Sequence, residues 1–102
     1  NHPYLTKERK IPARILKEPR FKNVVRTDKR GNAIFPHYDN NGLSGYELKN
    51  TGFTGFSRGG KKSLWKSSNL HNAKEIIITE SAIDALSHAT MNPRRDTAYL
   101  SI

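Results

Sequence analysis

The chain has 102 residues, no cysteine and a formal net charge of +9. This length suits one small domain or part of one, and the lack of cysteine excludes disulfide frameworks and thiolate metal sites. No apolar run approaches the roughly 18 residues of a membrane span, and no apolar signal core opens the chain, so we expect a cytoplasmic protein with no membrane partner.

The positive charge is unevenly distributed. Residues 7–30 carry ten Lys or Arg against three acids, whereas residues 74–102 carry three against four. Clustered Lys and Arg attract polyanions because binding releases counterions, so a basic front indicates a nucleic-acid partner. A solvated basic surface without a partner is the alternative interpretation.

The first half of the chain predicts short helices followed by strands. Residues 2–18 favour two short helices, because Pro3 and Pro12 suit first-turn positions where no N–H is needed. From residue 21 the pattern changes to strand, Gly-containing turn and strand, over residues 21–27 and 33–39. A second turn signal at residues 39–42 precedes a further strand over residues 43–49. We therefore expect a β meander in the middle of the chain.

The second half predicts a loop and then a β-α-β unit. Residues 51–68, rich in Gly, Ser and Lys, predict a loop with short strands at its ends. Residues 75–79 form a continuous apolar strand, of the kind buried on both faces of a parallel sheet. A helix over residues 82–90 ends before Asn92-Pro93, and residues 97–102 predict a second, parallel strand. The fold class is therefore α/β (α+β overall), with a basic β-rich part at 1–73 and the β-α-β part at 74–102.

The loop contains "GFSRGGKK", residues 55–62, which nearly matches a phosphate-binding loop. Lys62 replaces the hydroxyl that would hold magnesium, and no helix follows to direct its dipole at phosphates, so a nucleoside-triphosphatase loop is disfavoured. The basic side chains suit a phosphodiester backbone or unstacked bases instead. They are Arg58, Lys61, Lys62 and Lys66. The interleaved aromatic residues, Phe53, Phe56 and Trp65, either stack on bases or, as we favour, anchor the loop to the core.

The stretch "IIITESAIDALS", residues 76–87, places two acids in a basic chain. Glu80 follows the predicted strand, where ligands gather in parallel sheets, and could serve as a magnesium ligand or general base. It could also be a surface acid near a helix N-terminus. Ser81 and Asp84 fit a capping box, in which each side chain satisfies a backbone N–H and the cap contributes about 1 kcal/mol. A site role for Asp84 alongside the cap stays open.

The pattern of strand, Glu, three residues, Asp and helix in "ITESAIDAL" resembles the first motif of the Toprim domain. Bacterial primases, topoisomerases and related nucleases share this domain, although Ser81 stands where its commonest form has Gly. Upstream, "HPYLTKERKI", "GNAIFPHYDNNGLSGYELKN" and "GGKKSLW" resemble the segment that precedes Toprim in primase-like, relaxase-associated proteins of plasmids and integrative elements. The resemblance covers nearly the whole chain.

This resemblance implies roles for particular residues. Glu80 matches the family's catalytic and metal-associated acid, and Asp84 matches the acid that follows it. Lys49 and Lys62 match basic positions that face nucleic acid. The implied partners are single-stranded DNA or an RNA–DNA template, with other conjugation or replication proteins.

The family's second motif, Asp-x-Asp, binds the divalent metals, and it does not occur in these 102 residues. We therefore expect a truncated Toprim domain that is inactive and binds no metal tightly by itself. The intact protein would be a Mg²⁺- or Mn²⁺-dependent primase-like nucleotidyltransferase, or an enzyme that cleaves and joins DNA.

Two other functions remain open from the sequence. One is a nucleic-acid-binding module that keeps the Toprim-like fold without catalysis. The other is a protein-interaction domain whose basic face meets an acidic partner.

Overall fold

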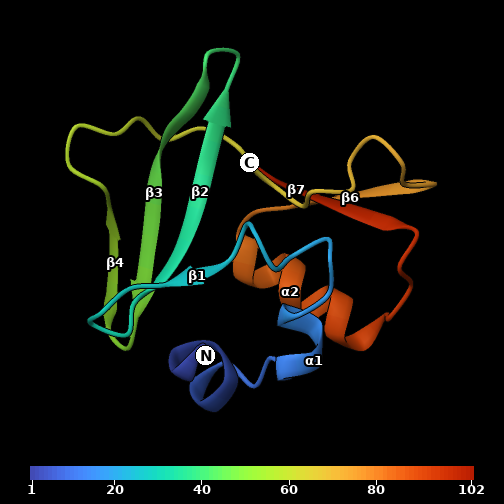
Figure 1. The fold of residues 1–102 in the computed structure, drawn as a ribbon, viewed down its shortest axis with the longest axis horizontal. Coiled ribbons are helices and arrows are strands. Elements are labelled where there is room, and N and C mark those ends of the chain that lie inside the picture. The colour runs from blue at the N-terminus through green and yellow to red at the C-terminus, as the bar shows by residue number, and fades with distance from the viewer.

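Two β-sheets and three short helices make up a mixed α+β structure, seen in a computed structural model that describes residues 1–102 (Figure 1). The four-stranded sheet has the order β1-β2-β3-β4, and the three-stranded sheet has the order β5-β7-β6. The longest helix has ten residues, and no helix is long and apolar enough to cross a membrane.

The two expected N-terminal helices are present. A single π-helical turn, η1, spans Tyr4–Glu8, and α1 spans Ala13–Leu16. Pro3 and Pro12 directly precede them, so neither proline removes a helical hydrogen bond. Lys10 lies between the helices with a φ of 61°, and the next N–H, from Ile11, donates back to the carbonyl of Leu5 at 2.9 Å. This left-handed residue ends η1 and turns the chain toward α1.

The strand expected over residues 21–27 is mostly wrong. Only Arg26–Thr27 forms a strand, β1, and the preceding residues form turns. The N–H groups of Phe21 and Val24 donate to the carbonyls of Glu18 and Phe21, at 2.9 and 3.0 Å. Turns satisfy the backbone here, and they bury both Phe21 and Val24, so no strand is needed to bring these side chains into the core.

The β meander is confirmed. β2 (Ala33–Asp39), β3 (Gly42–Asn50) and β4 (Phe53–Phe56) follow β1 in antiparallel order. Gly31, in the turn before β2, and Gly42, the first residue of β3 after the next turn, have φ values of 82° and 108°, a backbone conformation that favours glycine. The register shifts between His37 and Tyr38, whose partners are Gly45 and Leu43, so Ser44 is an extra residue in β3.

The β-α-β unit is also present. β6 (Glu75–Thr79) and β7 (Thr97–Ser101) pair in parallel, and α2 (Ala82–Met91) connects them. β5 (Trp65–Lys66) pairs with β7 in the antiparallel sense, so the sheets as a whole are mainly antiparallel.

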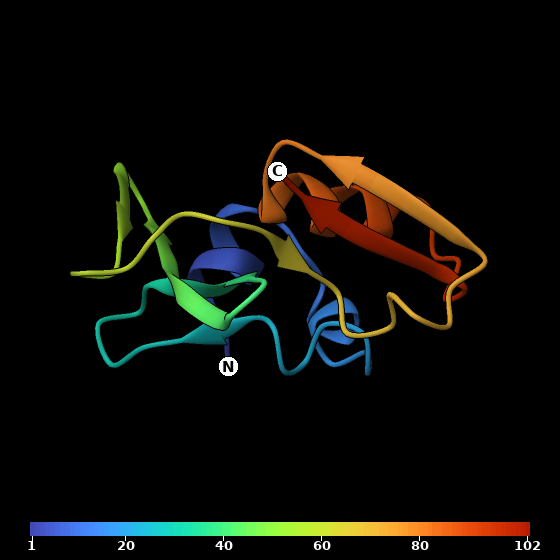
Figure 2. The same ribbon diagram turned by 90° about the horizontal axis from the view of Figure 1, so that it is seen from above.

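The expectation that β6 is buried on both faces is wrong. Ile77 packs against the core, whereas Ile76 and Ile78 are 51% and 61% exposed. β6 is an edge strand, and α2 covers one face of its sheet (Figure 2). A continuous apolar sequence therefore does not show that both faces of a strand are buried.

One hydrophobic core joins the two expected parts of the chain. Its 17 buried residues come from the N-terminal helices and the turns that follow them, and from the meander, β5, α2 and β7. Trp65, fully buried, stacks with Phe21 at 6.3 Å between ring centroids and meets Phe35 edge-on at 6.2 Å. Its indole N–H donates to the carbonyl of Val24 at 2.8 Å, so β5 is fixed by side chain and backbone alike.

Candidate nucleic-acid interface

The connection from β4 to β5, residues 57–64, is tied to the β2–β3 hairpin. The N–H of Ser57 donates to the carbonyl of Tyr46, and that of Lys61 to the carbonyl of Ser44, both at 2.8 Å. The N–H of Ser63 donates to Nδ1 of His37 at 3.0 Å. These bonds hold the backbone in place over its length.

Three of the expected nucleic-acid-binding residues lie on this connection. Arg58, Lys61 and Lys62 are exposed, and none of them makes an ion pair. Their charge is therefore uncompensated at short range and is carried by an anchored backbone. Such an arrangement suits contacts with phosphates.

The aromatic residues near the connection divide into two groups. Trp65 lies in the core, and Phe56 packs edge-on against the His37 ring at 5.2 Å, as the anchoring interpretation requires. A Cβ on Gly45 would come within 2.3 Å of the Phe56 ring, so only glycine permits this packing. The anchoring interpretation is wrong for Phe53, which is 48% exposed.

His37 links β2 to the connection through its imidazole. Burial lowers its pKa, the Lys62 charge acts in the same direction, and the Glu47 carboxylate opposes them. The neutral ring accepts from Ser63 at Nδ1, which leaves the proton on Nε2, and Nε2 is buried without a partner. Any protonation of the ring would remove the acceptor that holds Ser63.

Lys49 and Lys66 lie apart from the exposed connection. Lys49 is half-buried near the end of β3, and its ammonium donates to Oγ1 of Thr54 at 3.1 Å. The connection contacts β3 at its beginning, so the structure does not bring Lys49 to the other basic residues.

Lys66 lies on β5, with its Nζ 5.9 Å from the centroid of the Tyr38 ring. Both line a cavity of about 210 Å³ together with His71. Tyr38 is a residue that sequence reasoning missed. It reaches this position through an isolated bridge to Leu64, a pairing that no local pattern reveals.

Glu80 is exposed directly after β6 and makes no hydrogen bond or ion pair. Ser81 caps α2, because its Oγ accepts from the N–H of Asp84 at 3.1 Å. The Asp84 carboxylate makes no hydrogen bond back to Ser81, so the reciprocal half of the expected capping box is wrong. Asp84 is exposed, which leaves two free carboxylates at the start of α2.

The pairing of β5, β7 and β6 places the end of the basic connection near Glu80. Trp65 pairs with Ser101, and Ser101 pairs with Thr79, the residue before Glu80. Two strand spacings separate Trp65 from Thr79, which is about 10 Å. The carboxyl ends of β6 and β7 point toward the meander in both views (Figures 1 and 2).

The residues present do not fit a divalent-metal centre. No three His, Cys, Asp or Glu side chains lie close enough together to hold an ion. Two-metal phosphoryl transfer needs several carboxylates around paired ions, and Glu80 with Asp84 supplies too few.

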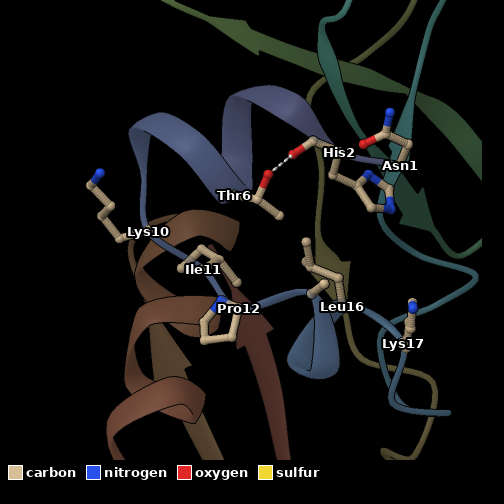
Figure 3. A pocket seen from close by; sticks show the side chains of 9 residues that line it. Asn1, His2, Thr6, Lys10, Ile11, Pro12, Leu16 and Lys17 are labelled. Atoms are coloured by element: carbon tan, nitrogen blue, oxygen red, sulfur yellow. Dashed lines mark hydrogen bonds between the residues drawn. The ribbon is translucent and has the colours of Figure 1, made fainter.

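The largest cavity lies away from these residues, between η1 and α1. It has a volume of about 680 Å³, and sequence reasoning did not identify any of its lining residues as a site (Figure 3). Its lining includes Lys10 and Lys17.

Comparison with known families places the chain. Residues 3–73 match the family described as "Protein of unknown function (DUF3991)". The chain belongs to the DUF3991 family. The DUF3991 match contains η1 to β5, with every expected nucleic-acid-binding lysine and arginine, whereas Glu80 and Asp84 lie outside it. No curated protein and no solved structure matches the chain.

Proposed function

We propose that this chain binds single-stranded nucleic acid through the basic connection between β4 and β5. The observation that carries the proposal is the combination of an anchored backbone with three exposed, unpaired cations, Arg58, Lys61 and Lys62. Neutralising phosphates with such side chains releases counterions and provides affinity without sequence preference.

A single strand is favoured over a duplex because the Tyr38 ring lies beside Lys66, and the Tyr38 backbone pairs with Leu64, the last residue of the connection. Tyr38 borders a cavity beside Lys66, and Phe53 is exposed on β4. Unstacked bases bind such rings, while cations follow the backbone. Lys49 has a smaller part in this proposal, because it is half-buried and held by Thr54.

The proposed setting is a primase-like, relaxase-associated Toprim protein of a mobile element. The parallel β6-α2-β7 unit, with Glu80 directly after β6, supports the resemblance to the first Toprim motif. In that setting Glu80 is the catalytic acid for nucleotidyl or phosphodiester transfer, and Mg²⁺ or Mn²⁺ is the cofactor of the intact protein. The carboxylates of this chain do not complete such a centre.

A binding module without catalysis is the second candidate function. It rests on the same exposed cations, Arg58, Lys61 and Lys62, and needs no metal-ligating cluster beside them. Both functions require the same basic connection, and they differ only in what Glu80 does.

The binding proposal is tested with a fluorescent oligothymidylate and anisotropy at several salt concentrations. The double variant Lys61→Gln/Lys62→Gln should bind more weakly, and the slope of log affinity against log salt should fall by about 1.4, or 0.7 for each lost contact. The matched control is Lys22→Gln/Lys29→Gln, which removes two exposed lysines elsewhere. Equal losses in both variants would show that only net charge matters and would overturn the assignment.

The catalytic proposal is tested in the intact protein with Glu80→Gln. This variant should lose turnover while its affinity for oligothymidylate stays at the wild-type level. Glu75→Gln is the matched control, because Glu75 is an exposed acid at the opposite end of the same strand. Turnover near the wild-type rate in Glu80→Gln would favour the binding module.

A further inference from the structure

The first 20 residues are strongly basic, and they have no part in the proposed interface. Their two acids, Glu8 and Glu18, have other partners. Glu8 accepts a hydrogen bond from Oγ1 of Thr51 at 2.5 Å. Glu18 is buried, and Oε1 of its carboxylate accepts from Nε of Arg20 at 2.7 Å. No lysine of the first 20 residues forms an ion pair with either acid.

Lys10 and Lys17 both line the cavity of about 680 Å³ between η1 and α1, and in Figure 3 they lie on opposite sides of it, with the Lys10 side chain extending outward. Neither lysine makes an ion pair, and no carboxylate lines the cavity. The apolar part of the lining consists of Ile11, Pro12, Ala13 and Leu16, and its accessible surface comes mainly from Pro12 and Ala13, because Ile11 and Leu16 are each only 2% exposed. The cavity thus combines an apolar surface with two separated cations.

His2 lines the same cavity without adding charge at neutral pH. Burial lowers its pKa. Its Nδ1 lies 2.7 Å from Oγ1 of Thr27 in β1, which fixes the ring beside the cavity. The positive potential in the cavity therefore comes from the lysines.

Lys10, which ends η1, has a backbone conformation that is unusual for a residue with a side chain. It is the only residue other than glycine with a positive φ. Glycine is the least strained choice at a left-handed residue that ends a helix. Strain of this kind persists where the surroundings enforce it, and it gathers at binding sites.

We infer that this cavity holds one nucleotide of a single strand, with its base against the apolar lining and its two flanking phosphates at Lys10 and Lys17. Every nucleotide within a strand has a phosphate on its 5′ side and another on its 3′ side, so one nucleotide in the cavity would present a phosphate to each lysine. The cavity volume lies within the range of small-molecule sites. The choice of ligand class rests on the proposed function, whereas the site itself is separate from the β4–β5 connection.

The first test measures binding of thymidine 3′,5′-bisphosphate by isothermal titration calorimetry. Lys10→Gln and Lys17→Gln should each weaken this binding about threefold to fivefold, as expected for one exposed charge pair. Lys22→Gln, an exposed lysine outside the cavity, should leave it unchanged. Thymidine 5′-monophosphate should bind more weakly than the bisphosphate. Equal affinity for the two probes would overturn the inference.

A second test places a charge inside the cavity without burying it. Ala13 is exposed on the cavity lining at the first position of α1. Ala13→Glu should abolish binding of the bisphosphate, whereas Ala13→Gln, of the same size, should retain it. Circular dichroism checks that both variants fold. Unchanged binding in Ala13→Glu would overturn the inference, and so would displacement of the bisphosphate by a poly-glutamate peptide at equal concentration.

Oligothymidylate separates this inference from the proposed function. If Lys61→Gln/Lys62→Gln weakens oligothymidylate binding but not bisphosphate binding, the two sites are distinct, as inferred. If wild-type protein binds oligothymidylate with no contribution from Lys10 or Lys17, the inference fails and the proposed function stands. If the wild-type protein does not bind oligothymidylate at all, the proposed function fails and takes the ligand class of this inference with it.

Discussion

The first 73 residues and the last 29 differ in charge and in topology. The first part has fifteen Lys or Arg and five acids, and it forms the helices η1 and α1 with an antiparallel meander. The last part has three Lys or Arg and four acids, and it forms a parallel β-α-β unit. The exposed cations of the β4–β5 connection therefore belong to the first part, whereas the free carboxylates of Glu80 and Asp84 belong to the last part.

The hydrophobic core does not divide between residues 1–73 and residues 74–102. Trp65 belongs to the basic part, yet β5 pairs with β7, and Trp65 packs in one core with Leu86 and Tyr99 of the last part. A boundary in charge is therefore no boundary in packing. The predictions below test how far the two parts depend on each other.

The largest expected effect follows from Trp65→Ala. Removing a fully buried indole and its hydrogen bond to Val24 should lower the free energy of unfolding by about 3–5 kcal/mol. Urea unfolding followed by circular dichroism should show a single transition, because both parts share the core. Trp65→Phe should cost less. Two separate transitions in the wild-type protein would contradict the shared core.

The next effect concerns the buried pair of Arg20 and Glu18. The Nη1 of Arg20 donates to the carbonyls of Arg94 and Thr97, at 2.9 and 2.8 Å, so it ties the first part to the start of β7. Arg20→Met should cost about 3 kcal/mol, because Glu18 is left buried with only a distant partner in Arg95. The double variant Arg20→Met/Glu18→Gln should recover part of this loss. A larger loss in the double variant would show that the Glu18 charge is not the cause.

Local sequence signals predicted the elements that depend on local chemistry. Gly31 and Gly42 mark the turns of the meander, and Ser81 marks the start of α2, because each position has a backbone requirement that few residues meet. The β-α-β unit was predicted from one apolar run and one helix of suitable length.

Features that depend on distant contacts were not predictable in the same way. The turns that bury Phe21, and the exposure of Ile76 and Ile78, follow from which surface covers each element. The sequence of an apolar run does not distinguish a strand that is covered on one face from a strand that is covered on both.

The residues of the candidate site also fall into those that local sequence predicts and those that only the fold brings together. Arg58, Lys61 and Lys62 were found by composition because they are close in sequence. Tyr38 joins Lys66 only through the bridge to Leu64, and the cavity with Lys10 and Lys17 arises from the packing of two helices. Lys49, which the resemblance pairs with Lys62 as a position that faces nucleic acid, lies near the far end of a nine-residue strand and away from the connection.

A smaller effect is expected from the cap of α2. Ser81→Ala should cost about 1 kcal/mol in the free energy of unfolding, because the N–H of Asp84 loses its acceptor. Asp84→Asn should change stability much less, since the Asp84 carboxylate makes no return hydrogen bond. Equal losses in both variants, measured by urea unfolding, would show that a reciprocal capping box forms in solution.

The smallest effect should appear only on acidification, and it concerns the meander alone. Because burial lowers the pKa of His37 below its ordinary 6.5, the unfolded chain takes up a proton on this ring before the folded chain does. The contribution of neutral His37 is therefore complete above pH 6.5 and is lost as the pH falls toward the lowered pKa. In His37→Gln, the fall in the urea midpoint between pH 7.5 and pH 5 should be smaller than in the wild-type protein.

The comparison between His37→Gln and the wild-type protein isolates this ring from other groups. His2, whose pKa is also lowered by burial, titrates equally in both proteins. The control His71→Gln removes an exposed imidazole and should keep the wild-type pH dependence. Hydrogen exchange at the amide of Ser63 should also accelerate on acidification more than at Lys61, because protonated His37 can no longer accept from Ser63. An identical pH dependence in His37→Gln and the wild-type protein would show that the basic connection is held to the meander by its backbone bonds alone.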